Sequence, residues 1–256
     1  MRVDQEAAIS VIDVCRQFAV DLGRRTLFRV LRDSVSGSRE PSPVRQALQH
    51  VDLLARHGEK VAIVGNNGAG KSTLLKIVAG LVRPTSGSVV VRGEMALLTA
   101  LGVGMIDELS VLDNTMLYGA LYGVEPARMR YALPDIMDWA GIAGYERAIL
   151  RTLSAGTRAR LAFSVVRHID ADILLIDEAL SAGDVNFRAK CRAFFDEPLN
   201  RDRTLLVATH DMEFARSFCT CTLWLHEGRV MGFGDSQAVI ARYLAAQAPP
   251  PRVASM

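Results

Sequence analysis

The stretch of sequence that decides the fold runs Gly65-Asn66-Asn67-Gly68-Ala69-Gly70-Lys71-Ser72-Thr73. It fits the pattern G-x-x-x-x-G-K-[S/T], with an apolar run at residues 61–64 before it and a helix-like run at 74–78 after it. Strand, glycine-rich loop and helix are the context in which this pattern forms a phosphate-binding loop. A chance glycine turn is the alternative, and the flanking runs disfavour it. The sequence therefore predicts that the chain binds a nucleoside triphosphate.

Each part of this loop has a chemical role. The small residues let successive backbone N–H groups face phosphate oxygens, and the N-terminus of the following helix favours an anion. Lys71 is expected to reach the β- and γ-phosphates, and the Ser72 hydroxyl to ligate Mg²⁺. All nine residues from 65 to 73 are therefore candidate nucleotide-binding residues, with ATP and Mg²⁺ as the expected cofactors.

A second candidate element follows four apolar residues at 173–176, where the sequence reads Asp177-Glu178. A carboxylate at the C-terminal end of a parallel strand projects into the crevice where such sheets bind ligands. We expect Asp177 to hold Mg²⁺, directly or through water, and Glu178 to orient and polarise the attacking water. Two acids after a strand also occur in ordinary solvated turns, but an upstream phosphate loop favours the catalytic interpretation.

Composition narrows the class of protein. The chain has 256 residues, half of them apolar, and a net charge of +2, which indicates a globular protein and gives no support for nucleic-acid binding. Its four cysteines form no C-x-x-C pair, so reduced thiols are expected rather than disulfides or a zinc site. No signal-peptide core follows Met1, and no apolar run approaches the roughly 18 residues that span a bilayer. We expect a cytosolic or peripheral protein.

Short apolar strands alternate with helical segments along the chain, which predicts a parallel sheet covered on both faces. The chain is expected to be disordered from residue 248. The expected strands are 9–14, 47–54, 88–92, 173–176 and 204–208, and the clearest expected helices are 112–118, 127–139 and one beginning at 154.

The stretch Leu153-Ser154-Ala155-Gly156-Thr157, just ahead of Asp177, resembles the LSGGQ signature of the ATPase subunits of ABC transporters. Ser154 and Gly156 match this signature, whereas Ala155 and Thr157 depart from it. Ser154 can cap the following helix and offer its hydroxyl to a γ-phosphate, and Gly156 allows close approach. The alternative is a helix-capping serine and nothing more; its place between the phosphate loop and Asp177 favours the family.

Two further motifs support this resemblance, which covers roughly residues 9–235. Residues 181–184 resemble the family's D-loop, with Asp184 at the acidic position. His210 stands after an expected strand, where the family carries its switch histidine, so the resemblance implies contact with the γ-phosphate and with the attacking water. A lone histidine is more often structural, but this one follows a parallel strand in the order that the family requires.

The resemblance implies an α/β P-loop NTPase fold with a parallel-sheet core, an N-terminal antiparallel β-subdomain and an α-helical subdomain near 95–155. The ATPase domain would cover 1–245, and 246–256 would be a disordered tail. The family's ATPases act as head-to-tail homodimers, so the Lys71 loop of one protomer and Ser154 and Gly156 of the other would enclose each ATP. Hydrolysis would then drive a separate transmembrane permease.

One difference between this sequence and the usual family pattern narrows the expected function. Most family members have a glutamine between the phosphate loop and the signature, but this chain has none between Lys71 and Leu153. Residues 101–114 instead resemble the subgroup that exports polysaccharides and lipid-linked glycans such as O-antigen, capsule and teichoic acid. What replaces the glutamine stays open, with Glu108 a weak electrostatic substitute.

The resemblance therefore implies an ATPase subunit at the cytoplasmic face of the inner membrane, with the glycan handled mainly by the permease. Another ABC transporter, such as an importer, and a soluble ABC ATPase of translation or DNA repair are the alternatives. The chain lacks the second ATPase module and the long coiled-coil inserts of those soluble proteins, which disfavours them.

Two features that precede the phosphate loop in the sequence each allow two interpretations. Phe18 is the best candidate for the aromatic residue that stacks on adenine, although a buried core phenylalanine fits equally well. Residues 24–43 form an insertion that begins with four interleaved arginines and becomes rich in Ser, Gly and Pro. The arginine-rich part is either a basic amphipathic helix against lipid headgroups or the permease, or a surface helix of its own domain.

Overall fold

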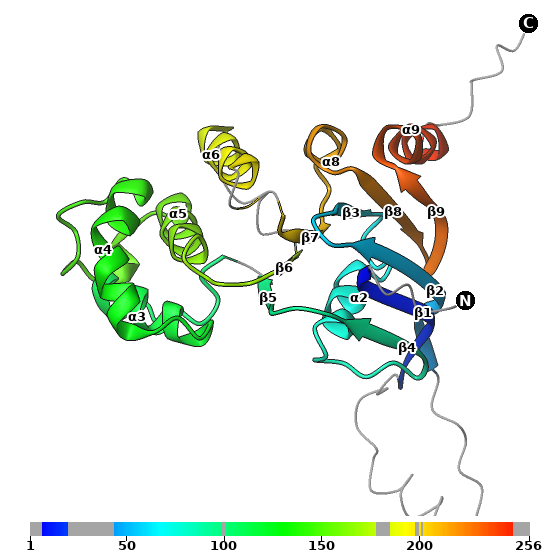
Figure 1. Ribbon diagram of the computed structural model, residues 1–256, viewed down its shortest axis with the longest axis horizontal. Coiled ribbons are helices and arrows are strands. Elements are labelled where there is room, and N and C mark those ends of the chain that lie inside the picture. Colours follow the sequence, from blue (N-terminus) through cyan, green and yellow to red (C-terminus); the bar gives the residue numbers. More distant parts are fainter. Residues whose placement is uncertain are drawn as a thin grey trace, which may run out of the picture.

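The computed structural model describes residues 7–19, 44–98, 101–177, 185–197, 200 and 202–247. These residues form a small three-stranded sheet, a larger six-stranded sheet, and a group of helices to one side (Figure 1). The insertion at 24–43, the candidates Glu178 and Asp184, and the segment from 248 lie outside the described residues.

The small sheet is antiparallel and has the order β2-β1-β4. Apolar side chains such as Val11, Val14 and Val51 are fully buried on it, and they pack toward the phosphate-loop helix. The predicted strands at 9–14 and 47–54 fall within this sheet, and the one at 88–92 matches β4 except that β4 ends at Val91. Its strands are β1 (Ala7–Ala19), β2 (Val44–Arg56) and β4 (Ser86–Val91).

The large sheet has the order β5-β6-β7-β3-β8-β9, and every pair is parallel except the antiparallel pair of β8 and β9. The strands β3 and β7 are buried along their whole length, which explains the unbroken apolar runs at 61–64 and 205–208. The strands are β3 (Lys60–Val64), β5 (Met95–Leu98), β6 (Ile173–Asp177), β7 (Thr204–Ala208), β8 (Cys221–His226) and β9 (Arg229–Asp235).

Three helices, α3, α5 and α8, begin at a residue whose side chain caps them. Ser110, Ser154 and Asp211 each accept a hydrogen bond from the backbone N–H three residues on. The predicted helices at 112–118, 127–139 and after 154 are present. The helical elements are α2 (Lys71–Val78), α3 (Val111–Leu121), α4 (Pro126–Ala140), the short 3₁₀ helix η1 (Leu150–Thr152), α5 (Ala155–Val166), α6 (Val185–Asp196), α8 (Met212–Phe218) and α9 (Ser236–Gln247).

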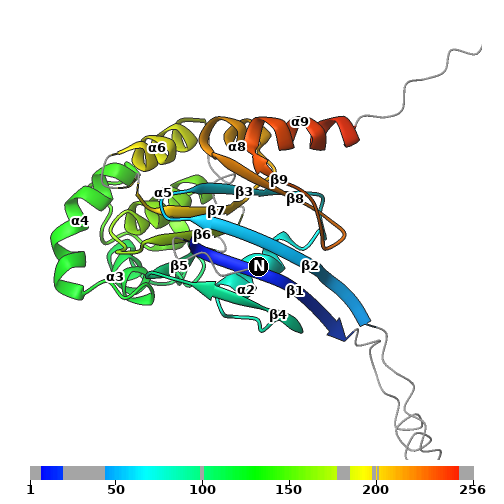
Figure 2. The ribbon, with the colours of Figure 1, turned by 45° about the vertical axis from the view of Figure 1, so that its right-hand side comes forward.

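Three apolar clusters hold these layers together. The helix α2 lies between the two sheets and packs its Leu74 and Leu75 against both of them. On the opposite face of the large sheet, α8 and α9 cover β3 and β8 (Figure 2). The third cluster centres on Phe163 of α5, whose ring stacks on Trp139 of α4 at a centroid distance of 5.5 Å. The phosphate loop therefore follows the C-terminal end of β3, an interior strand of a sheet that is packed on both faces.

Two boundaries differ from those expected. The helical unit was predicted from about residue 95, but residues 95–98 form β5 at the edge of the large sheet, because they pair with β6 in parallel register. The tail was predicted from 246, but α9 continues through Gln247.

In the part of the chain that the structure describes, no helix combines the length and apolarity needed to cross a bilayer.

Candidate nucleotide-binding site

The phosphate loop joins the end of β3 to the start of α2. Lys71, the first residue of α2, is almost fully buried, and its Nζ donates hydrogen bonds to the carbonyl oxygens of Gly65 at 2.8 Å and Asn66 at 3.3 Å. The ammonium group is thus held inside the loop, next to the first turn of the helix. A cation and a helix N-terminus at one place favour a bound phosphate.

Two glycines of this loop are required by its geometry. Gly70 has a φ of 108°, and a Cβ there would lie 2.6 Å from the Ala47 carbonyl oxygen. Gly65 has a φ of 150°, and a Cβ there would overlap the Leu225 carbonyl oxygen of β8. Any other residue at either position would push the loop away from the strands, so the glycines allow the backbone to approach them.

The predicted metal ligands lie side by side. The Ser72 hydroxyl donates a hydrogen bond to Oδ1 of Asp177 at 3.1 Å, although the two residues are far apart in sequence. Asp177 ends β6, and its register partner Ala208 ends the neighbouring β7, two residues before His210. A hydroxyl and a carboxylate are hard oxygen donors of the kind that Mg²⁺ prefers, so these residues fit that ion.

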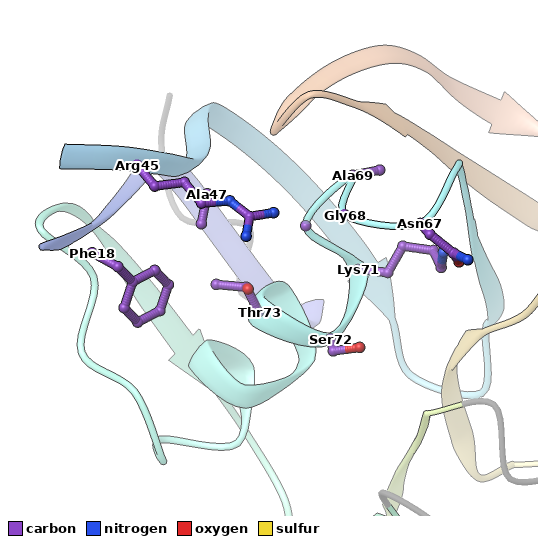
Figure 3. Close-up of a pocket in the computed structure, with 10 residues that line it drawn as sticks. Phe18, Arg45, Ala47, Asn67, Gly68, Ala69, Lys71, Ser72 and Thr73 are labelled. Carbon is purple, nitrogen blue, oxygen red and sulfur yellow. The ribbon is translucent and has the colours of Figure 1, made fainter. Parts of the chain in front are cut away.

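A cavity of about 300 Å³ opens beside the loop. It is lined by residues 67–73 and, from the small sheet, by Phe18, Arg45 and Ala47 (Figure 3). Phe18 is 36% exposed, so the alternative of a buried core phenylalanine does not fit. The guanidinium of Arg16 lies 4.4 Å from the centroid of its ring. The side chain of Phe18 therefore stands where an aromatic base could stack beside the loop.

Arg45 is a residue of this cavity that the sequence did not indicate. It is the register partner of Phe18 across β1 and β2, and its side chain extends toward the loop (Figure 3). A Cβ placed on Gly68 would lie 3.3 Å from Nη2 of Arg45. The antiparallel pairing of the two strands would have been the only signal for it, and that register cannot be read from either strand alone.

The candidate signature residues lie elsewhere. Ser154 caps α5, accepting a hydrogen bond from the Thr157 backbone N–H at 3.2 Å, and both Ser154 and Gly156 stay outside the cavity. Among the residues that the structure describes, a Cβ on Gly156 would meet nothing closer than Nη1 of Arg160, at 4.0 Å. Figure 1 shows α5 grouped with α3 and α4, away from α2. Within one chain, the signature and the phosphate loop are therefore separate surfaces.

The segment that stands in place of the missing glutamine is attached to the signature. Arg158, in the first turn of α5, donates to Oδ1 of Asp107 at 2.6 Å and to the Leu153 carbonyl at 3.2 Å. The backbone N–H of Arg151 donates to the Asp107 carbonyl at 3.1 Å. The segment after β5 and the turn before Ser154 are thus held together by side-chain and main-chain bonds.

The comparisons with known proteins decide the family. A family model described as ABC transporter matches residues 48–181, which is more than half of the chain and includes the phosphate loop, the signature and Asp177. The chain belongs to the ABC transporter family.

Relatives of this ABC transporter chain include export proteins. A teichoic acids export ATP-binding protein of Bacillus anthracis is 37% identical over 197 residues, which is 77% of this chain and 36% of that protein. An O-antigen export system ATP-binding protein of Klebsiella pneumoniae is 34% identical over 202 residues, 79% of this chain and 82% of that protein. The chain therefore spans well under half the length of the Bacillus relative.

Solved structures confirm the predicted fold of this ABC transporter domain. A dimeric ATP-binding cassette in a post-hydrolysis state with ADP and Pi matches with a TM-score of 0.69 at 22% identity, over 89% of this chain and 98% of that chain. CbiO1 of Clostridium perfringens, part of the ABC transporter complex cbiONQ, matches with a TM-score of 0.67 at 19% identity, over 97% and 96% of the two chains. The α/β fold with its parallel core sheet, antiparallel β-subdomain and helical subdomain is the ABC ATPase fold.

Replacing Phe18 by alanine is expected to raise the Kd for ATP by about fivefold to a hundredfold, the range that corresponds to loss of one base–aromatic stack. The measurement is equilibrium binding of ATP by calorimetry. Phe233→Ala serves as the matched control, because Phe233 lies on β9 and is 40% exposed, close to the 36% of Phe18. Equal affinities for the two variants would show that Phe18 does not contact the nucleotide.

Proposed function

We propose that this chain is the ATP-hydrolysing nucleotide-binding subunit of an ABC exporter for a polysaccharide or a lipid-linked glycan. The observation that carries the ATPase part is the contact between Ser72 and Asp177 at 3.1 Å, beside the buried Lys71 ammonium. It joins the end of β6 to the first turn of the phosphate-loop helix, the turn that also carries Lys71.

The residues of this site divide the work of phosphoryl transfer. Lys71 and the loop N–H groups offset the negative charge of the β- and γ-phosphates. Ser72 and Asp177 would hold Mg²⁺, which when bound supplies a positive charge against the phosphate oxygens. Glu178, directly after Asp177 in the chain, would orient and polarise the attacking water, and His210 would contact the γ-phosphate. The chemistry would be mostly electrostatic stabilisation and positioning of the reacting groups.

A second copy of the chain would complete the site. Ser154 and Gly156 lie outside the cavity of their own chain, at the N-terminus of α5, where a Cβ on Gly156 would meet no described atom closer than 4.0 Å. A head-to-tail homodimer would bring this N-terminus, with Asp184, against the phosphates bound by the other protomer. Closure on ATP and opening after hydrolysis would then move the helical group α3, α4 and α5 and, through it, a separate transmembrane permease. The protein would thus work peripherally, at the cytoplasmic face of the membrane.

Glycan export is supported by two observations. The relatives include proteins named for teichoic acid export and for O-antigen export. The segment 101–114, which takes the place of the glutamine-bearing stretch, resembles that subgroup and is bonded to the signature through Asp107 and Arg158. The glycan itself would be recognised mainly by the permease.

The test is to purify the tagged chain from detergent-solubilised membranes in the presence and absence of ATP and to identify its partners by mass spectrometry. We expect a membrane protein with several transmembrane spans to be recovered in stoichiometric amount with the tagged chain, together with glycosyltransferases. Recovery of ribosomal or DNA-repair proteins without a membrane subunit would refute the exporter assignment and favour a soluble ABC ATPase.

A further inference from the structure

We propose that the last turn of α9 positions the phosphate-binding loop by holding the side chain of Asn66. This inference rests on the proposed nucleotide site, since it assigns a role in preparing that site to a helix near the C-terminal end of the described chain. Asn66 is the second residue of the loop, whereas α9 begins far along the chain at Ser236. The contact between them therefore exists only in the folded protein.

Two donors from α9 meet one acceptor on the loop. Nε2 of Gln247 donates a hydrogen bond to Oδ1 of Asn66 at 2.6 Å, and the Tyr243 hydroxyl donates to the same oxygen at 3.3 Å. Gln247 stands one helical turn beyond Tyr243, so both side chains project from the same face of the helix. The loop side chain is thus held by two side chains of one helix.

The part of α9 that makes this contact is fixed in turn. Tyr243 is only 7% exposed, and its ring packs edge-on against Trp224 of β8 at a centroid distance of 5.6 Å. The same apolar cluster contains Val64, the last residue of β3 before the loop. Burial also raises the pKa of Tyr243, so its hydroxyl stays protonated and can donate to Asn66. Strand, helix and loop are therefore anchored to one another.

Asn66 matters because its backbone defines the shape of the loop. Its carbonyl oxygen accepts a hydrogen bond from the Ala69 backbone N–H at 3.1 Å and one from Nζ of Lys71 at 3.3 Å. Holding the side chain of Asn66 consequently also positions the carbonyl oxygen to which the Lys71 ammonium is hydrogen-bonded before a phosphate binds. A loop that is ordered in advance loses less conformational freedom when the nucleotide binds, so the contact favours binding.

The decisive variant is Gln247→Ala, with Gln237→Ala as its matched control. Both glutamines are exposed and lie on α9, but Gln237 donates to the Arg216 carbonyl at 3.3 Å and does not contact the loop. Loss of one hydrogen bond predicts a Kd for ATP that is raised about two- to tenfold in Gln247→Ala. Gln237→Ala is expected to bind like the unmodified chain. Tyr243→Phe, which keeps the packed ring, provides an independent second variant.

Two measurements separate positioning from a general loss of stability. In the nucleotide-free protein, backbone amides of residues 66–71 are expected to exchange faster in Gln247→Ala than in Gln237→Ala, while those of β3 stay unchanged. In a double-mutant cycle with Asn66→Ala, the affinity losses should be less than additive, because both changes remove the same contact. Unchanged loop exchange, an affinity equal to that of the control, or additive losses would each overturn the proposal. If the unmodified chain binds no ATP, the proposed function fails, and loop exchange alone still decides this inference.

Discussion

Replacing Lys71 by alanine is expected to lower the rate of ATP hydrolysis by about a hundredfold to a thousandfold, the usual cost of removing one charge-stabilising donor from an active site. The Lys71 ammonium donates hydrogen bonds to the carbonyl oxygens of Gly65 and Asn66 at the N-terminus of the helix α2. It is also almost fully buried, and in the proposed site it would lie close to the place where phosphate charge develops. Steady-state phosphate release by the purified chain, at saturating ATP, gives the measurement.

Lys76→Ala is the matched control for this experiment. Lys76 belongs to the same helix as Lys71, but it is exposed in the last turn, away from the phosphate loop. The control is expected to retain full hydrolysis and the same thermal stability. If Lys71→Ala and Lys76→Ala lose activity to the same extent, the phosphate loop is not the catalytic site.

The substitution Glu178→Gln is expected to keep ATP binding and to reduce turnover by about a hundredfold to ten-thousandfold, the contribution of a positioned general base. Binding should persist because Lys71, Ser72 and Asp177 are unchanged, and these residues would hold the phosphates and the metal ion. An ATP-bound closed dimer should then accumulate, since hydrolysis no longer opens it. Light scattering with and without ATP measures this dimer, and phosphate release measures turnover.

Glu94→Gln provides the control for the glutamate. Glu94 is exposed in the turn between β4 and β5, at the opposite end of the large sheet from the end of β6. This variant should hydrolyse ATP normally and form no excess of closed dimer. Unimpaired hydrolysis by Glu178→Gln would remove Glu178 from the catalytic role and leave the nature of the base open.

Much of this fold could be predicted because its signals are local. The run at 61–64 is apolar throughout since β3 is buried on both faces, and Ser154 precedes α5 since its hydroxyl caps the helix. The edge strand β5 was missed because four residues carry too little periodicity to be told from the start of a helical segment. The predicted domain end at 245 falls two residues before the end of α9, which is within the usual uncertainty at a helix end.

The sequence by itself determined the order of strand, loop and helix around Lys71, the strand that ends at Asp177 and the family to which they belong. These features depend on neighbours along the chain. Tertiary structure alone decided that Ser72 meets Asp177, that Arg45 faces the cavity beside Phe18, and that Gln247 holds Asn66. Each of these contacts depends on strand register or helix packing between distant segments, and no local pattern in the sequence specifies which distant segments will pair.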